Sequence, residues 1–247
     1  MVIPKPGKAD YSKARAHRVI SLLDTLGKLV ERTAAHLIAE QLELKRRLHD
    51  GQYGSRVRRS TVDAVACLMN FAQQAWGKKE VAGALMMDIK SAFNNVSRSH
   101  LAARMMRLGV DPQLVRWTLS FMEDRHIIVE LDGKPGEARH GLDSGIPQGS
   151  PASPVLFAVY IAEMFSEVEE KMDGQIKALS FVDDVAWLAS GKDAQQVQAT
   201  MEAAAGFAMD WVARNAVAFD TEKTDAVWLR SPLRWRAREA SRSGTRR

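Results

Sequence analysis

"LSFVDDVAWLA", residues 179–189, places two adjacent carboxylates, Asp183 and Asp184, in the middle of an otherwise apolar run. The residues on either side have the composition of buried strands, so we expect the two aspartates at the turn of a β-hairpin. Like charges at such a turn repel each other unless cations lie between them. The dipeptide alone is also typical of an ordinary turn exposed to water. Whether it is such a turn or part of a metal site therefore depends on other carboxylates in the chain.

A third carboxylate, Asp88, follows the short apolar segment 84–87, which predicts another buried strand. If the two strands are neighbours, the three aspartates converge on one edge of a sheet. Side chains alternate across a strand, so only one of Asp183 and Asp184 is expected to share a face with Asp88, unless the turn bends sharply. We therefore expect unequal roles for the two, one as an essential metal ligand and the other as a weaker one. Mg²⁺ prefers carboxylate oxygens, and a pair of these ions would offset the repulsion.

The rest of the chain predicts an α+β fold in which helices cover one face of a mainly antiparallel sheet. Apolar residues at helical spacing predict a helix over 19–48, after a loop over 1–16. Caps and periodicity predict further helices from Ser60 or Thr61, over 99–107, from Asp111-Pro112, from Ser153-Pro154 to before Gly174, and over 193–215, with a helical turn that begins near Ser91. Asp132-Gly133 is the strongest hairpin signal, and residues 216–219 and 226–230 predict two short strands.

Composition and charge limit the classes of protein to which the chain can belong. The 247 residues, 46% of them apolar, suffice for one large domain or two small ones. No long apolar run or signal peptide is present, so we expect an intracellular protein without a membrane partner. The single cysteine, Cys67, excludes a disulfide framework and a cysteine-cluster zinc site. Residues 1–59 carry a net charge of +7 and residues 228–247 of +6, around a centre of −8, which suits a polyanionic partner but is equally explained by solvated basic faces.

Six blocks, in this order along the chain, resemble the reverse transcriptases of non-LTR (LINE-type) retrotransposons. Three of them are similar to that family's palm motifs: MMDIKSAFNNVS (86–97), SGIPQGSPASPVLF (144–157) and LSFVDDVAW (179–187). The others are similar to its fingers motif, to the block after it and to its lysine-containing block: PKPGKADYSKARAHRVISLLDTLGKLVER (4–32), GQYGSRVRRSTVDAV (51–65) and FDTEKTDAVWL (219–229). The resemblance covers residues 4–230, and six ordered blocks are much more specific than any one alone.

The resemblance implies a right-hand polymerase, with a palm over 66–230 and a partial helical fingers region over 1–65. Residues 231–247 form a basic tail that we expect to be disordered, and we expect no thumb, endonuclease or RNase H domain. The implied activity is RNA-directed DNA polymerisation, a two-metal nucleotidyl transfer from a dNTP to a primer 3′-hydroxyl. The implied partners are an RNA template, a DNA primer and dNTPs, and the oligomeric state stays open.

Metal and proton chemistry follow from the same resemblance. Asp88 and Asp183 are implied to bind two Mg²⁺ ions, with Asp184 assisting and the backbone carbonyl of Ile89 completing a metal site. On this resemblance we expect Asp183 to be the indispensable ligand of the adjacent pair. Mn²⁺ is an alternative ion. Lys223 is implied as the proton donor to departing pyrophosphate, although a plain salt bridge explains this lysine nearly as well.

Substrate binding is implied for a second set of residues. Phe93 would be a steric gate against a 2′-hydroxyl, or else a helix residue that fills the core. Gln148 and Gly149 would pack against the incoming nucleotide and the template, or else form a loop kept for its turn geometry. Arg18, helped by Lys5 or Lys8, would grip the triphosphate, because arginine binds phosphate oxygens bidentately.

Two other functions fit parts of the pattern. A non-catalytic RNA-binding relic of a retroelement would keep the fold without polymerising. An unrelated metal-dependent phosphotransferase would use the carboxylates without needing Phe93 or Gln148. The sequence also departs from the family at Val19, where a proline is usual, and at Phe181-Val182, where many members have Tyr-Ala. Neither departure removes a metal ligand, and the intact aspartates favour the polymerase.

Overall fold

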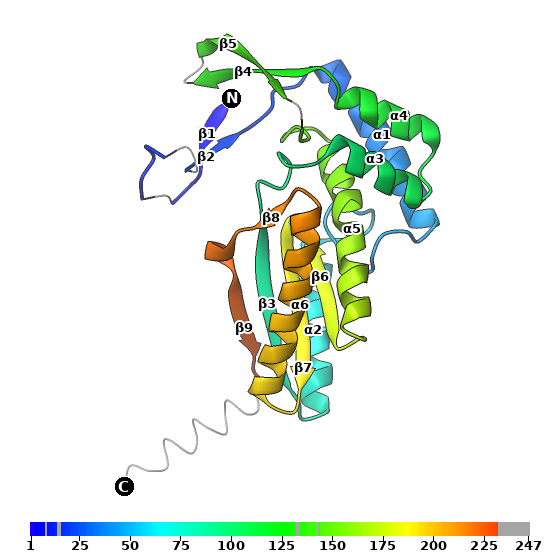
Figure 1. The fold of residues 1–247 in the computed structure, drawn as a ribbon, viewed down its shortest axis with the longest axis vertical. Coiled ribbons are helices and arrows are strands. Elements are labelled where there is room, and N and C mark those ends of the chain that lie inside the picture. The colour runs from blue at the N-terminus through cyan, green and yellow to red at the C-terminus, as the bar shows by residue number, and fades with distance from the viewer. Residues whose placement is uncertain (8, 14–15, 132–133, 143, 232–247) are drawn as a thin grey trace. The chain divides into compact units, whose positions relative to one another are not determined.

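Figure 1 shows the computed structural model of the chain, which describes residues 1–231 except 8, 14–15, 132–133 and 143. The described residues form two compact units, one of residues 1–48 with 91–160 and the other of residues 49–90 with the chain from 161. We call them the first and the second unit and describe each by itself. Within the described ranges, no helix combines the length and apolar character that crossing a membrane requires.

A five-stranded antiparallel sheet organises the second unit. Its strands are β3 (Val81–Lys90), β6 (Ile176–Phe181), β7 (Asp184–Gly191), β8 (Ala218–Phe219) and β9 (Asp225–Leu229). The central strand, β3, pairs with β7 on one side and with β8 and β9 on the other, and β6 pairs with the outer side of β7. The antiparallel sheet and the hairpin over 179–189 are therefore confirmed. β3 is longer than the predicted segment 84–87, because neighbouring strands pair with it along most of its length.

Helices cover both faces of this sheet, and not one face as predicted (Figure 1). Successive β3 residues point to opposite faces. Ala84 packs with Ala64 of α2 (Thr61–Gly77) in one apolar cluster, whereas the backbone of Gly83 lies against Val197 and Met201 of α6 (Ala194–Arg214). The lower half of α5 (Ser153–Lys171) also belongs to this unit, where Phe165 contacts Trp187 at a ring distance of 5.9 Å.

The first unit combines helices with two small strand pairs. Its elements are β1 (Val2–Pro4), β2 (His17–Val19), α1 (Thr25–Leu44), α3 (Arg98–Arg107), α4 (Pro112–Phe121), β4 (Arg125–Leu131), β5 (Lys134–Leu142) and the first half of α5. β1 pairs with β2, and β4 pairs with β5 as predicted for this segment. The predicted turn residues of that hairpin, Asp132 and Gly133, lie outside the described residues, as does the predicted tail from residue 232.

The first helix begins later than its periodicity predicts. Residues 17–19 are paired in β2, and the Asp24 carboxylate accepts hydrogen bonds from the backbone N–H of Leu26 (2.9 Å) and Gly27 (3.3 Å), which caps the helix N-terminus. The predicted loop over 1–16 likewise contains β1. The buried face of α1 is made mainly of alanines with Ile38 and Leu42, while Leu26 and Leu29 are 74% and 62% exposed.

Local helix signals were otherwise reliable. Four N-caps accept hydrogen bonds from the first turns of their helices: Ser60, Ser97, Asp111 and Asp193. Ser60 forms a reciprocal capping box with Asp63. Near Ser91, where a helical turn is predicted, residues 91–95 form turns before α3, and the Asn94 N–H donates to the Ser91 carbonyl (2.9 Å).

Candidate active site

The sheet of the second unit brings Asp88, Asp183 and Asp184 together. Asp88 lies opposite Asp184 in the β3–β7 register, and Phe181 of β6 pairs with the same residue. Val182 and Asp183 therefore form a two-residue turn, in which Val182 takes a φ of +60°. The Ile89 N–H donates to the Asp183 carbonyl (3.1 Å), so the backbone that follows Asp88 is bonded to the turn.

The segment after residue 49 packs against this hairpin, and two glycines make the close approach possible. A Cβ on Gly51 would lie 2.1 Å from the carbonyl oxygen of Ala178, and one on Gly54 would lie 2.4 Å from the nitrogen of Val182. Between them, the Tyr53 N–H donates to the Ser180 carbonyl (2.9 Å). No side chain fits at either glycine without moving the backbone, so this segment holds the aspartate turn in place.

Burial and nearby like charges raise the pKa of both Asp183 and Asp184, so both carboxyls ionise less readily than an exposed aspartate. Burial raises the pKa of Asp183, and the charges of Asp184 and Asp88 raise it further, with partial compensation by Lys223. The pKa of Asp184 is also raised, by burial first and by Asp88 second. A cation bound among these carboxylates would therefore stabilise their ionised forms.

Lys223 supplies one cation from within the chain. It ends the short 3-10 helix η2 (Thr221–Lys223), and its Nζ lies 2.5 Å from Asp88 Oδ2 and 3.7 Å from Asp220 Oδ2. The hydrogen bond to Asp88 raises the pKa of Lys223. The Asp220 N–H donates to the Asp88 carbonyl (2.8 Å), which fixes the start of this turn beside β3.

The donor set suits a hard divalent cation by its chemistry, because three carboxylates and the nearby main chain of Ile89 offer only oxygen ligands. In the part of the chain that the structure describes, no three His, Cys, Asp or Glu side chains are already arranged around a metal position. Asp88 is engaged by Lys223 instead. A metal would therefore have to share Asp88 with this lysine or displace it.

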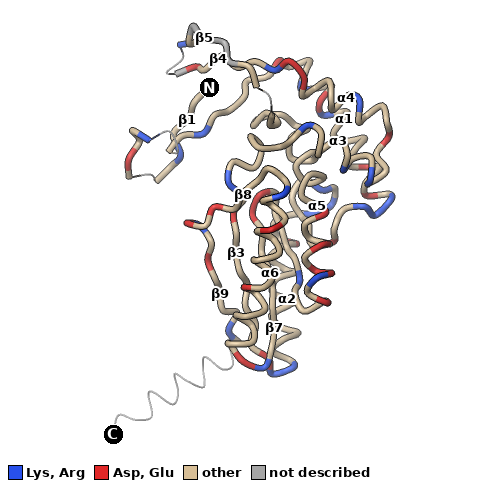
Figure 2. The backbone as a smooth tube through the Cα atoms, in the orientation of Figure 1, with Lys and Arg blue, Asp and Glu red and all other residues tan. Residues whose placement is uncertain are grey.

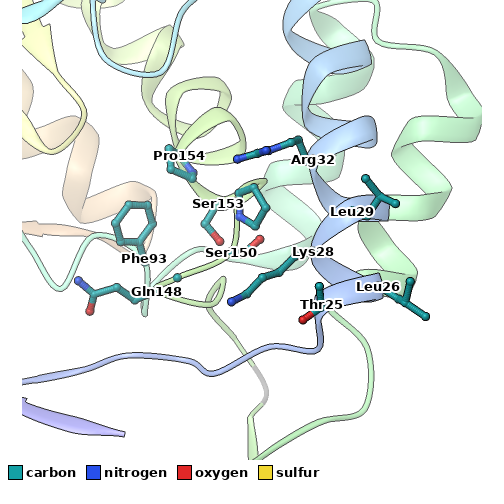
Figure 3. Close-up of a pocket in the computed structure, with 12 residues that line it drawn as sticks. Thr25, Leu26, Lys28, Leu29, Arg32, Phe93, Gln148, Ser150, Ser153 and Pro154 are labelled. Carbon is teal, nitrogen blue, oxygen red and sulfur yellow. The ribbon is translucent and has the colours of Figure 1, made fainter.

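A separate pocket of about 650 Å³ lies in the first unit (Figure 3). Phe93 lies on one side of it, beside Gln148 and Gly149 of the loop that leads into α5. Its other lining residues come from α1, from the same loop and from the start of α5: Thr25, Leu26, Lys28, Leu29, Arg32, Ser150, Pro151, Ser153 and Pro154. The structure thus brings together three of the residues predicted to bind substrate, Phe93, Gln148 and Gly149.

Backbone contacts hold Phe93 and this loop in place. The Phe93 ring packs on Phe157 (5.4 Å between centroids), and its carbonyl accepts from the Ile146 N–H (2.7 Å). The Gln148 carbonyl accepts from the Ser21 N–H (2.7 Å). Gly149 has a φ of +122°, and a Cβ there would lie 2.7 Å from the Ser21 carbonyl oxygen. The turn-geometry explanation for Gly149 therefore holds alongside any contact with substrate.

The remaining predicted phosphate ligands lie elsewhere or outside the description. Arg18 lies in β2 opposite Ile3, with an exposed side chain, and does not line the pocket. Lys5 follows β1, where its N–H donates to the Ala16 carbonyl (2.8 Å). Lys8 lies outside the described residues.

Sequence reasoning missed four polar residues around the pocket: Lys28, Glu31, Arg32 and Ser150. Glu31 of α1 is 7% exposed and accepts a short hydrogen bond from Ser150 Oγ, which itself accepts from the Ala152 N–H (3.0 Å). Burial lowers the pKa of nearby Arg125, and the charge of Glu31 opposes that shift. The sequence KLVER (28–32) does contain a signal for three of them. Glu31 and Arg32 follow Lys28 by three and four residues, a spacing that places all three charges on one side of a helix.

Known proteins similar to this chain are reverse transcriptases. The reverse transcriptase (RNA-dependent DNA polymerase) family profile matches residues 3–238. The RNA-directed DNA polymerase from mobile element jockey of Drosophila funebris is 33% identical over 190 residues, 76% of this chain and 20% of the relative. The probable RNA-directed DNA polymerase from transposon BS of Drosophila melanogaster is 33% identical over 192 residues, 77% of this chain and 21% of the relative. The chain spans about a fifth of the length of these curated relatives.

Solved structures support the fold. Apo telomerase from Candida tropicalis matches with a TM-score of 0.59 at 14% identity, over 83% of this chain and 36% of that one. At this identity the likeness shows the fold alone. The right-hand polymerase fold and the resemblance to reverse transcriptases of non-LTR elements are thereby confirmed. Because the family profile covers nearly the whole sequence, the chain belongs to the reverse transcriptase (RNA-dependent DNA polymerase) family.

Proposed function

We propose that this chain is the polymerase core of a non-LTR retroelement and adds deoxynucleotides to a primer 3′-hydroxyl on an RNA template. The carrying observation is the β3–β7 register, which holds Asp88 opposite Asp184 with Asp183 in the adjoining turn, in a chain of the reverse transcriptase family. The raised pKa values of Asp183 and Asp184 support the proposal, since a cluster that disfavours its own ionisation is stabilised by bound cations.

The carboxylates would hold two Mg²⁺ ions, with Mn²⁺ as a substitute. Bound there, the metals supply Lewis-acid activation of the primer hydroxyl and neutralise charge on the triphosphate. Asp88 and Asp183 act as the main ligands, Asp184 assists them, and the Ile89 carbonyl adds a neutral oxygen. Lys223, whose pKa is raised by its hydrogen bond to Asp88, is held protonated beside that carboxylate and would donate its proton to the departing pyrophosphate.

The pocket residues would bind the nucleotide substrate. Phe93 excludes a 2′-hydroxyl and selects dNTPs, while Gln148 and Gly149 contact the incoming nucleotide and the template. Pocket placement supports these three roles. Arg18 and Lys8 remain proposed triphosphate ligands from the family resemblance alone.

Primer extension on poly(rA)/oligo(dT) with dTTP and Mg²⁺ tests the proposal. We expect extension by the wild-type chain, and loss of at least about a hundredfold in rate with Asp183→Asn, which keeps the side-chain size but removes the charge. RNA binding should change little in the variant. Tight RNA binding without extension by the wild-type chain would favour the non-catalytic relic instead.

A further inference from the structure

Two cations of α1, Lys28 and Arg32, line the pocket that contains Phe93 and Gln148 (Figure 3). They are four residues apart and therefore lie on one side of the helix, separated by about 6 Å along its axis. Lys28 is partly buried and Arg32 is exposed. Three further cations, Lys45, Arg46 and Arg47, follow the far end of α1. None of them lines the pocket. Figure 2 shows how lysines and arginines are distributed along the backbone.

The acidic residue between these cations does not neutralise them. Glu31 is engaged by Ser150 Oγ and interacts electrostatically with Arg125. Among the described residues, no ion pair joins Glu31 to Lys28 or to Arg32. Other cations of the chain do form ion pairs, such as Lys171 and Arg214, which both pair with Glu167. The two cations are thus available to an external anion.

The rest of the pocket lining combines apolar rings with the polar side chains of Gln148, Ser150 and Ser153. Phe93, Pro151 and Pro154 present ring surfaces, and Leu26 and Leu29 add exposed apolar side chains next to the cations. A ligand with flat apolar rings and separated negative charges satisfies both the rings and the cations, and a nucleotide has this chemistry. A purely apolar ligand would leave Lys28 unpaired, and inorganic anions would leave the rings uncovered.

We propose that Lys28 and Arg32 bind phosphate groups of the nucleotide in this pocket. The inference rests on the proposed polymerase function for the identity of the ligand, and assigns the contact to α1, where the family resemblance had named Arg18 and Lys8. The phosphates could belong to an incoming dNTP or to an RNA strand, since both carry the same negative groups. If they belong to a dNTP, the two cations control the affinity for dNTP; if they belong to a strand, the cations control the affinity for RNA.

The test measures two affinities of the whole chain: the KM for dTTP in primer extension, and the Kd for a labelled single-stranded RNA at several salt concentrations. Lys28→Gln and Arg32→Gln remove one charge each while keeping a good helix former. Arg116→Gln is the matched control, because Arg116 is exposed on α4 and does not line the pocket. Lys28→Arg retains the charge and should stay close to wild type.

For a triphosphate contact, the KM for dTTP rises about tenfold in each variant, as expected for one lost charge-assisted hydrogen bond, and RNA affinity follows the control. For a strand contact, RNA affinity falls about tenfold and the slope of log affinity against log salt drops by about 0.7. Either result supports the proposal. Variants that match Arg116→Gln in both measurements, with unchanged melting temperature, would overturn it. If the wild-type chain extends no primer, the polymerase proposal fails, and direct binding of RNA and of a fluorescent dNTP still decides this one.

Discussion

Asp184, the first residue of β7, lies directly opposite Asp88 of β3. Opposed residues of antiparallel strands extend to the same face of a sheet, so register alone makes Asp184 the partner of Asp88. Asp183 occupies the tight turn, and its carbonyl is bonded to the Ile89 N–H. Strand alternation therefore fixes the position of Asp184, and the turn fixes that of Asp183. Their roles are expected to be unequal, and the indispensable role of Asp183 stays a prediction.

Asp183→Asn should stabilise the metal-free protein at neutral pH. The pKa of Asp183 is raised in the folded state. Its protonated carboxyl therefore contributes fully to the free energy of unfolding below the ordinary aspartate pKa of 3.8, and this contribution is lost as the pH rises. The free energy of unfolding of Asp183→Asn should thus exceed that of the wild type by an amount that grows between pH 4 and pH 7.5. The difference should reach only about 0.5 kcal/mol, because solvent screens the charge of a partly exposed group. Urea unfolding in EDTA at several pH values measures it.

Mg²⁺ provides the matching control. Because a ligand that binds only the folded state stabilises it, Mg²⁺ should raise the melting temperature of the wild type more than that of Asp183→Asn. An equal shift in both proteins would contradict metal binding at Asp183.

Lys223→Gln should strengthen metal binding and weaken catalysis. Lys223 Nζ lies 2.5 Å from Asp88 Oδ2 and competes with a cation for that carboxylate. Its removal should lower the Mg²⁺ concentration needed for half-maximal thermal stabilisation. Loss of the proton donor should lower the single-turnover extension rate by up to about 100-fold. If only the metal dependence changes, Lys223 has the salt-bridge role and not the donor role.

The aspartate hairpin and the helix caps could be predicted from sequence because both depend on nearby residues. The residues on both sides of Asp183 and Asp184 are short, nearly continuous apolar runs, which are typical of strands buried on both faces. Ser60 and Asp111 cap their helices through residues only two or three positions away. Such signals need no knowledge of the tertiary structure.

The pocket cations could not be found in this way, because their exposure depends on which side of α1 is buried. Periodicity favoured a face of leucines, whereas the helix packs through its alanines, which allow close approach and leave Leu26 and Leu29 exposed. The start of α1 was likewise decided by the pairing of residues 17–19 with residues 2–4, a contact that periodicity does not encode.

Phe93→Val should admit ribonucleotides. If the ring blocks a 2′-hydroxyl, a smaller side chain should raise the ratio of kcat/KM for UTP to that for dTTP by at least about tenfold. Phe93→Tyr keeps the ring and is the control. Since Phe93 also packs on Phe157, the melting temperature must be compared, and a loss of stability with an unchanged ratio would favour the core-filling role.

Gly149→Ala should destabilise the protein by about 1–3 kcal/mol, because a side chain at a φ of +122° is strained and its Cβ would lie 2.7 Å from the Ser21 carbonyl. The control is Gly206→Ala on α6, where no atom lies within 4 Å of the new Cβ. That change should stabilise by about 0.5–1 kcal/mol. Urea unfolding measures the free energy of unfolding of both variants. Equal changes in the two would show that Gly149 is not required for the backbone conformation at this position.

Glu31→Ala should loosen the loop that carries Gln148. Its carboxylate is buried, accepts from Ser150 Oγ and faces the buried charge of Arg125, so its loss leaves a donor and a cation poorly compensated. We expect the free energy of unfolding to fall by about 1–3 kcal/mol, against almost no change for exposed Glu40→Ala on the same helix.

Glu31→Gln separates the hydrogen bond from the charge, since it keeps an acceptor for Ser150 and removes the partner of Arg125. If the loop depends on the hydrogen bond, Glu31→Gln should retain the wild-type KM for dTTP, while Glu31→Ala and Ser150→Ala should raise it together at temperatures where all are folded. A raised KM in Glu31→Gln, equal to that of Glu31→Ala, would instead assign the role of Glu31 to its charge beside Arg125.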